Sequence, residues 1–171
     1  MQEVSCRATR ILLDGLEQVG LDPERSSWPT PLAQLRDPRQ RMSWAAFVAV
    51  LDQVAALAEG RITLLALGRA LADAPATRLL LGMVRPFVGD GWGHLHALRW
   101  GGTALVPVVK VDLSVGPDGR AVLTGRLDES FPGSSHYFAL TNGVSLALSE
   151  RVLGQTLPYE AIATPHLGRL T

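Results

Sequence analysis

The sequence predicts an α+β domain in which helices pack on one face of a small antiparallel sheet. Through most of the first 100 positions, apolar residues recur at intervals of three and four, the spacing of amphipathic helices. At Thr103 the pattern changes to alternation, and a turn sequence then returns the chain as a second strand. Helices followed by a hairpin, a helix and a strand are typical of the α+β class. Because 171 residues suit one domain, we expect a single domain over 1–171, helical over 1–100, with hairpin, helix and strand over 103–165.

The first helix is expected over residues 4–19. Ser5 can cap its N-terminus, and Gly20 stands where the helical spacing stops. Prolines are frequent in the connector at residues 21–41, and each removes a backbone donor and fixes φ, so only short turns can form there. The connector should still be ordered, because it contains a tryptophan and leucines that can be buried.

A second helix is predicted from Trp44, with Ser43 as its cap and Gly60 at its end. Its apolar residues stand at positions i, i+3, i+4 and i+7, which makes the clearest helical stripe in the chain. Two further helical segments follow at residues 62–74 and 76–85. A proline marks the end of each of them.

A glycine-rich corner at residues 89–93 leads through a short apolar segment into the predicted hairpin. The first strand, at 103–115, contains Pro107, which cannot donate to a ladder of hydrogen bonds. The strand should therefore lie at a sheet edge or carry a bulge. Residues 116–119 have the turn sequence GPDG, and residues 120–129 return as the second strand.

The final long helix is expected to begin at Ser134 or Ser135, either of which can cap it, and to end at Gly154. Residues 159–164 have the length and β-branched content of one more short strand. His166 would then be a surface residue that follows the last strand.

The composition excludes several classes of function. The 16 basic and 16 acidic side chains cancel, so the chain has no electrostatic footprint for nucleic acid or anionic lipid. No long apolar run predicts a membrane span, and the N-terminus lacks a secretory signal pattern. Cys6 is the single cysteine, so neither an intramolecular disulfide nor a cysteine-based metal site can form. We therefore expect a cytoplasmic protein that contacts neither nucleic acid nor membrane.

No catalytic motif stands out. None of the serines lies in GxSxG, and the glycine corner lacks the lysine and the preceding strand of a phosphate loop. Asp128 and Glu129 are adjacent, so on a strand their carboxylates point to opposite faces. No HExxH spacing indicates a metal site. We therefore predict a protein that is not an enzyme and holds no metal or cofactor.

The candidate ligand-binding residues lie between the helical part and the hairpin, and at the start of the last helix. His94 and His96 would share one face of an extended segment and could bind a metal or haem iron, whereas in a helix they diverge by about 200°. Aromatic walls with a few polar groups are typical of small-molecule pockets and equally of cores, so both interpretations stay open. The predicted set is Trp92, His94, His96, Trp100, His136 and Tyr137.

Three segments carry a resemblance to known families: a first helix that leads into GLDP, a segment ending in LRDPRQRMSW, and a helix from Trp44. With them the chain resembles the arabinose-binding-type N-terminal domain of AraC-type transcription regulators and similar N-terminal regions of bacterial histidine kinases. Residues 96–166 are similar to the hairpin, helix and final strand of those domains. More distantly, the chain resembles 4-vinyl-reductase-like and haem-NO-binding-like ligand domains.

The resemblance implies a sensory or signal-input domain that binds a small effector and passes the result to an output domain or a partner signalling protein. Our first hypothesis is such a non-enzymatic domain, homodimeric, with a pocket between helices and sheet. The second is a docking or dimerisation module without a ligand. The third is a haem or gas sensor that uses His94, His96 or His136 as axial ligand.

Overall fold

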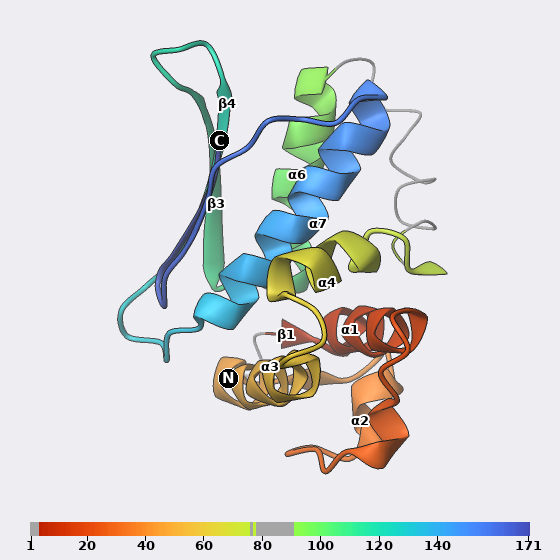
Figure 1. The fold of residues 1–171 in the computed structure, drawn as a ribbon. Helices are drawn as coiled ribbons and strands as arrows, with labels where there is room; N and C mark the ends of the chain where they lie inside the picture. The colour runs from red at the N-terminus through yellow and green to blue at the C-terminus, as the bar shows by residue number, and fades with distance from the viewer. Residues whose placement is uncertain (1–3, 76, 78–90) are drawn as a thin grey trace.

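Figure 1 shows a computed structural model, which describes residues 4–75, 77 and 91–171. Its helices and strands confirm the predicted α+β class. In chain order they are β1 (Val4–Ser5), α1 (Cys6–Gln18), the 3-10 turn η1 (Pro23–Arg25), α2 (Leu32–Arg36), β2 (Arg41–Met42), α3 (Trp44–Ala58), α4 (Leu64–Leu71), α6 (Gly91–Leu105), β3 (Val109–Val115), β4 (Ala121–Leu127), α7 (Ser135–Leu153), β5 (Ala161–Ala163) and β6 (Leu167–Leu170).

The main sheet has the strand order β3-β4-β6-β5, and every neighbouring pair is antiparallel. β3 lies at an edge, as Pro107 predicts, but the strand begins at Val109 and not at Thr103. The reason is that Thr103–Leu105 complete α6: the Thr103 hydroxyl donates to the Arg99 carbonyl, and Val106 N–H donates to the Gly102 carbonyl. Helical hydrogen bonds therefore override the apolar alternation over these residues.

The predicted caps are confirmed at the long helices. Ser5 Oγ accepts from Arg7 N at the start of α1, and Ser43 Oγ accepts from Ala46 N at the start of α3. Ser134 Oγ caps α7 by accepting from Tyr137 N at 3.2 Å. Gly154 ends α7 with φ +68°, a left-handed conformation that glycine adopts without strain.

Further segments differ from the prediction: residues 4–5 and 41–42 pair as the short strands β1 and β2, and the connector contains the short helix α2. The short apolar segment after the glycine corner is the helix α6, and a strand, β6, follows the predicted last strand. His166 precedes β6, and its carbonyl accepts from Leu127 N at 3.0 Å. The helix predicted at residues 76–85 lies, apart from Thr77, outside the described residues.

Helices cover one face of the main sheet (Figure 1). α6 packs on β3, and α7 packs on β5 and β6 beside it, while α4 crosses α7 and separates it from α1. Phe138 of α7 lies over Gly125 and Gly168, which pair across β4 and β6; a Cβ on Gly168 would lie 2.9 Å from the Phe138 Cβ and Cγ. The two glycines thus let α7 approach the sheet closely.

Trp44 connects the helical part of the chain to the segment before α7. The side chain is 1% exposed, its Nε1 donates to the Pro132 carbonyl at 2.7 Å, and its ring packs edge-on against Tyr137 at 5.3 Å between centroids. We expect Trp44→Phe to lower the free energy of unfolding by about 2 kcal/mol, because the hydrogen bond from the buried indole to the Pro132 carbonyl is lost and the smaller ring leaves a void.

Urea denaturation followed by circular dichroism measures this loss. Trp28→Phe is the matched control, because Trp28 Nε1 donates to the carbonyl of Pro23, only five residues away, and its side chain is half-buried. An equal loss of stability in both variants would contradict the role of Trp44 as the long-range connection.

Candidate functional site

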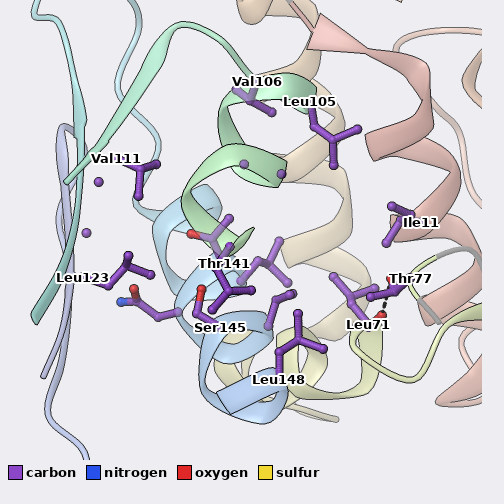
Figure 2. A pocket seen from close by; sticks show the side chains of 18 of the residues that line it. Ile11, Leu71, Thr77, Leu105, Val106, Val111, Leu123, Thr141, Ser145 and Leu148 are labelled. Atoms are coloured by element: carbon purple, nitrogen blue, oxygen red, sulfur yellow. Dashed lines mark hydrogen bonds between the residues drawn. The ribbon is translucent and has the colours of Figure 1, made fainter. Parts of the chain in front are cut away.

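A cavity of about 1020 Å³ lies between the sheet and the helices (Figure 2). This volume is at the upper end of the range typical of small-molecule pockets, roughly 300–1,000 Å³. Helices α1, α3, α4, α6 and α7 contribute to its walls, together with β3, β4 and one residue of β6. The walls are mostly apolar, and the apolar residues labelled in Figure 2 are Ile11, Leu71, Leu105, Val106, Val111, Leu123 and Leu148.

Small residues in α6 help to keep this space open. Gly101 and Gly102 both line the cavity, and so does Ala97 one turn earlier. A Cβ on Gly102 would meet only Val111 Cγ2, at 3.8 Å, which is an ordinary van der Waals distance. The cavity therefore exists partly because α6 presents backbone, and no side chain, at Gly101 and Gly102.

The polar groups inside the cavity are neutral. Thr141 and Ser145 stand one turn apart on α7, and Figure 2 shows both side chains directed into the space. The Thr141 hydroxyl donates to the Tyr137 carbonyl at 3.0 Å, and the Thr77 hydroxyl donates to the Leu71 carbonyl at 2.9 Å. Both hydroxyl oxygens keep lone pairs that can accept a hydrogen bond from a ligand.

Tyr137 adds a neutral donor to the wall. Its ring packs against Trp44, Phe47 and Phe138, and the side chain is 7% exposed. Burial raises the pKa of its hydroxyl, so the group stays protonated at physiological pH and can donate to a ligand.

His94 is the buried histidine of the cavity wall. The side chain is 3% exposed, and its Nε2 is buried without a hydrogen-bond partner among the described residues. Burial also lowers the pKa of His94, so the imidazole is neutral at physiological pH. A buried polar atom without a partner costs about 1–3 kcal/mol and calls for an explanation, such as a ligand.

A second, smaller cavity of about 280 Å³ adjoins the first. Both cavities are lined by His94, Leu123, Ser145 and Leu153, which therefore stand between them.

One end of the large cavity carries an ion pair. Arg151, in the last turn of α7, lines the cavity together with Asp73, and its Nη2 lies 2.5 Å from Asp73 Oδ1. Arg151 Nη1 donates to the Ala72 carbonyl at 3.1 Å. Both charged side chains are close to half exposed, so this end of the cavity is near solvent.

The structure brings two of the six predicted ligand-binding residues, His94 and Tyr137, to the cavity. His96 is exposed, because α6 is a helix and the two histidines diverge around it. Trp100 is 76% exposed, so the aromatic wall expected there does not form. The side chain of Trp92 lies outside the described part of the chain.

His136 is placed away from the cavity. Its Nδ1 lies 3.0 Å from Asp52 Oδ1, so the side chain connects the first turn of α7 to α3. This contact joins two helices at the surface and leaves His136 no position in the cavity wall.

Sequence reasoning missed the polar residues on α7 and the cation at its end. Thr141 and Ser145 interrupt an apolar helix face at a spacing of four, which is a signal that the sequence contains. Arg151 carries no such signal, since its position at the cavity depends on how α7 meets α4.

Among the described residues, no group of three or more His, Cys, Asp or Glu side chains could hold a metal ion. Over the same residues, no helix is long and apolar enough to cross a membrane.

Comparison with known proteins finds a similar fold among solved structures. No family model and no curated protein matches the chain. A crystal structure of an H-NOX protein from S. oneidensis in the Fe(II)NO ligation state superposes with a TM-score of 0.51 at 11% sequence identity. The match covers 94% of this chain and 86% of that chain. At this identity the likeness shows a shared fold, which agrees with the predicted distant resemblance to haem-NO-binding-like domains. The predicted resemblance to AraC-type regulators and histidine kinases finds no match and stays a prediction.

Proposed function

We propose that the chain is a non-enzymatic sensory domain that binds a small apolar effector in the large cavity. The observation that carries the proposal is a space of about 1020 Å³ with mostly apolar walls. Protein interiors are close-packed and contain few voids larger than a water molecule, so a space of this size favours an occupant. The fold shared with an H-NOX protein supports a ligand-binding domain of this kind.

The position of the cavity also suits a sensor. Its walls come from α1 and α3 on one side and from β3 and β4 on the other, so a ligand would contact both the helical part and the sheet. Binding would therefore favour one arrangement of the two over others. An output domain or a signalling partner, and a second copy of the chain, would then recognise that arrangement.

A native mass spectrum of the purified protein, with an organic extract of the same sample, tests the proposal. We expect an additional mass on the chain that is lost on denaturation and is recovered in the extract. A bare chain from several expression hosts, together with no uptake of apolar probes such as dodecan-1-ol, would contradict the proposal and favour a docking module.

A haem or gas sensor is the second candidate, and His94 is the observation that favours it. Haem iron is commonly held by one histidine, and His94 offers a neutral imidazole with an unpartnered Nε2 in the wall of an apolar cavity. The residues present therefore fit the group, with His94 as the side chain that would hold the iron. His96 and His136, the other predicted axial ligands, do not line the cavity.

The variant His94→Leu separates the two candidates. In a protein that holds no haem, it should raise the free energy of unfolding by about 1 kcal/mol, because it removes a buried polar atom without a partner. In a haem protein, it should abolish the shift of the haem absorption band on reconstitution. His96→Leu is the control and should change neither property. Wild-type protein that leaves the spectrum of added haem unchanged would contradict the haem candidate.

His94 should also make the stability of the ligand-free protein depend on pH. Its pKa is lowered from 6.5 by burial, so the unfolded chain binds the proton more readily than the folded one. The protein therefore keeps its full stability above pH 6.5 and loses stability as the pH falls toward the lowered folded pKa. Urea midpoints between pH 5 and pH 8 should therefore fall more steeply on acidification for wild type than for His94→Leu.

A further inference from the structure

We infer that the ligand of the large cavity has an uncharged apolar body and one anionic group, and that Arg151 binds that group. The inference rests on the proposed function and names the chemical class of the effector. It also assigns a binding role to Arg151, which the sequence gives no reason to single out.

The interior of the cavity selects an uncharged body. The polar side chains along its walls are the hydroxyls of Thr77, Thr141 and Ser145, the amide of Asn142, the phenol of Tyr137 and the imidazole of His94. None of these carries a charge at neutral pH. A charged group without a partner is costly to bury, so a charge on the ligand must lie elsewhere.

The charged residues of the cavity wall, among those that the structure describes, are Arg151 and Asp73. They lie together at one end, where α7 finishes and the side chains of Val152 and Leu153 are 46% and 50% exposed. An amphipathic ligand can therefore place its apolar body in the interior and its charged group at this end, close to water.

Arg151 is built to receive an anion. Two contacts of its guanidinium, with Asp73 Oδ1 and with the Ala72 carbonyl, hold it against the end of α4. An arginine has more N–H donors than these contacts use, in a planar fork that matches a carboxylate or a phosphate. Asp73 is 48% exposed, so its ion pair with Arg151 is partly solvated and a ligand anion can compete with it for the guanidinium.

The test compares dodecanoate and dodecyl phosphate with dodecan-1-ol, by calorimetry or native mass spectrometry on the full chain. We expect Arg151→Gln to weaken binding of the two anions about tenfold and to leave dodecan-1-ol within about twofold. Arg151→Lys keeps the charge and should recover part of the loss. The stronger of the two anions identifies the headgroup.

Arg69→Gln is the matched control. Arg69 Nη2 lies 2.5 Å from Glu150 Oε2, so this variant breaks an ion pair between the same two helices, yet Arg69 does not line the cavity. It should change none of the three affinities. An equal effect of Arg69→Gln and Arg151→Gln on the anions would overturn the assignment to Arg151.

The apolar body is tested with decanoate, dodecanoate and tetradecanoate. Each two-carbon extension should tighten binding about fifteenfold, since each buried CH₂ contributes about fourfold.

Anions and alcohol that bind equally well, with no effect of Arg151→Gln, would overturn the inference and leave the proposed function standing. A co-purifying compound without an anionic group would likewise overturn the inference and leave the proposed function standing. The outcome that contradicts the proposed function itself is a different one: neither these probes nor any co-purifying compound binds.

Discussion

Replacing Gly143 with alanine should destabilise the protein by about 3 kcal/mol, because α4 and α7 touch backbone to backbone at this position. A Cβ on Gly143 would overlap the Leu65 carbonyl oxygen and lie 3.0 Å from Arg69 N and Gly68 Cα. Gly68 has the reciprocal contact with the Leu140 carbonyl of α7. Backbone atoms cannot rotate aside as a side chain does, so the two helices would have to separate.

The same substitution at Gly102, also within a helix, is the control and should have the opposite sign. A Cβ there meets only Val111 Cγ2, at 3.8 Å, so alanine adds helix propensity without overlap. We expect Gly102→Ala to raise the free energy of unfolding by about 0.5–1 kcal/mol. Urea denaturation of both variants measures the difference. A Gly143→Ala variant as stable as wild type would contradict the close crossing of α4 and α7.

Local chemistry made much of this fold predictable from the sequence. Ser43 and Ser134 cap helices because a serine hydroxyl satisfies a free backbone N–H in the first turn. Gly154 ends α7 and Gly119 lies in the hairpin turn because both adopt positive φ. These signals act within a few residues, so the sequence contains them without knowledge of the tertiary structure.

α6 and β6 were less predictable because contacts distant in the sequence stabilise them. Four glycines lower the helix propensity of α6, yet it forms a 15-residue helix that packs on β3 and α7. β6 is only four residues long, and it forms between β4 and β5, with Gly168 pairing with Gly125. Neither the sheet order nor this register can be read from residues 167–170 alone.

The candidate site, too, depends on tertiary structure that the sequence does not show. His94 and Tyr137 were singled out by residue type, and both line the cavity. Trp100 was chosen on the same ground and is exposed, because the helical periodicity of α6 turns it away from the cavity that His94 lines. Residue type therefore suggested the candidates, and the helical phase of α6 separated His94 from His96 and Trp100.

Filling the cavity from α6 should weaken effector binding about a hundredfold with little change in stability. Gly102→Trp places an indole in the space between α6 and β3, where Gly102 has no close neighbour apart from Val111. If the indole displaces three or four methylene groups of an apolar ligand, at about 0.8 kcal/mol each, the dissociation constant should rise about a hundredfold. Calorimetry with dodecan-1-ol or with the co-purified compound measures this change.

Thr103→Trp separates occlusion of the cavity from the mere addition of an aromatic ring. Thr103 is the next residue of the same helix, is exposed and does not line the cavity, so this variant should bind as wild type does. Circular dichroism and urea midpoints of both variants establish that they fold. If Gly102→Trp folds and binds with unchanged affinity, the effector does not occupy the space beside α6, and the sensory site must lie elsewhere on the chain. If it folds and loses binding while Thr103→Trp retains it, the ligand lies between α6 and the sheet, in contact with the elements whose relative position it would control.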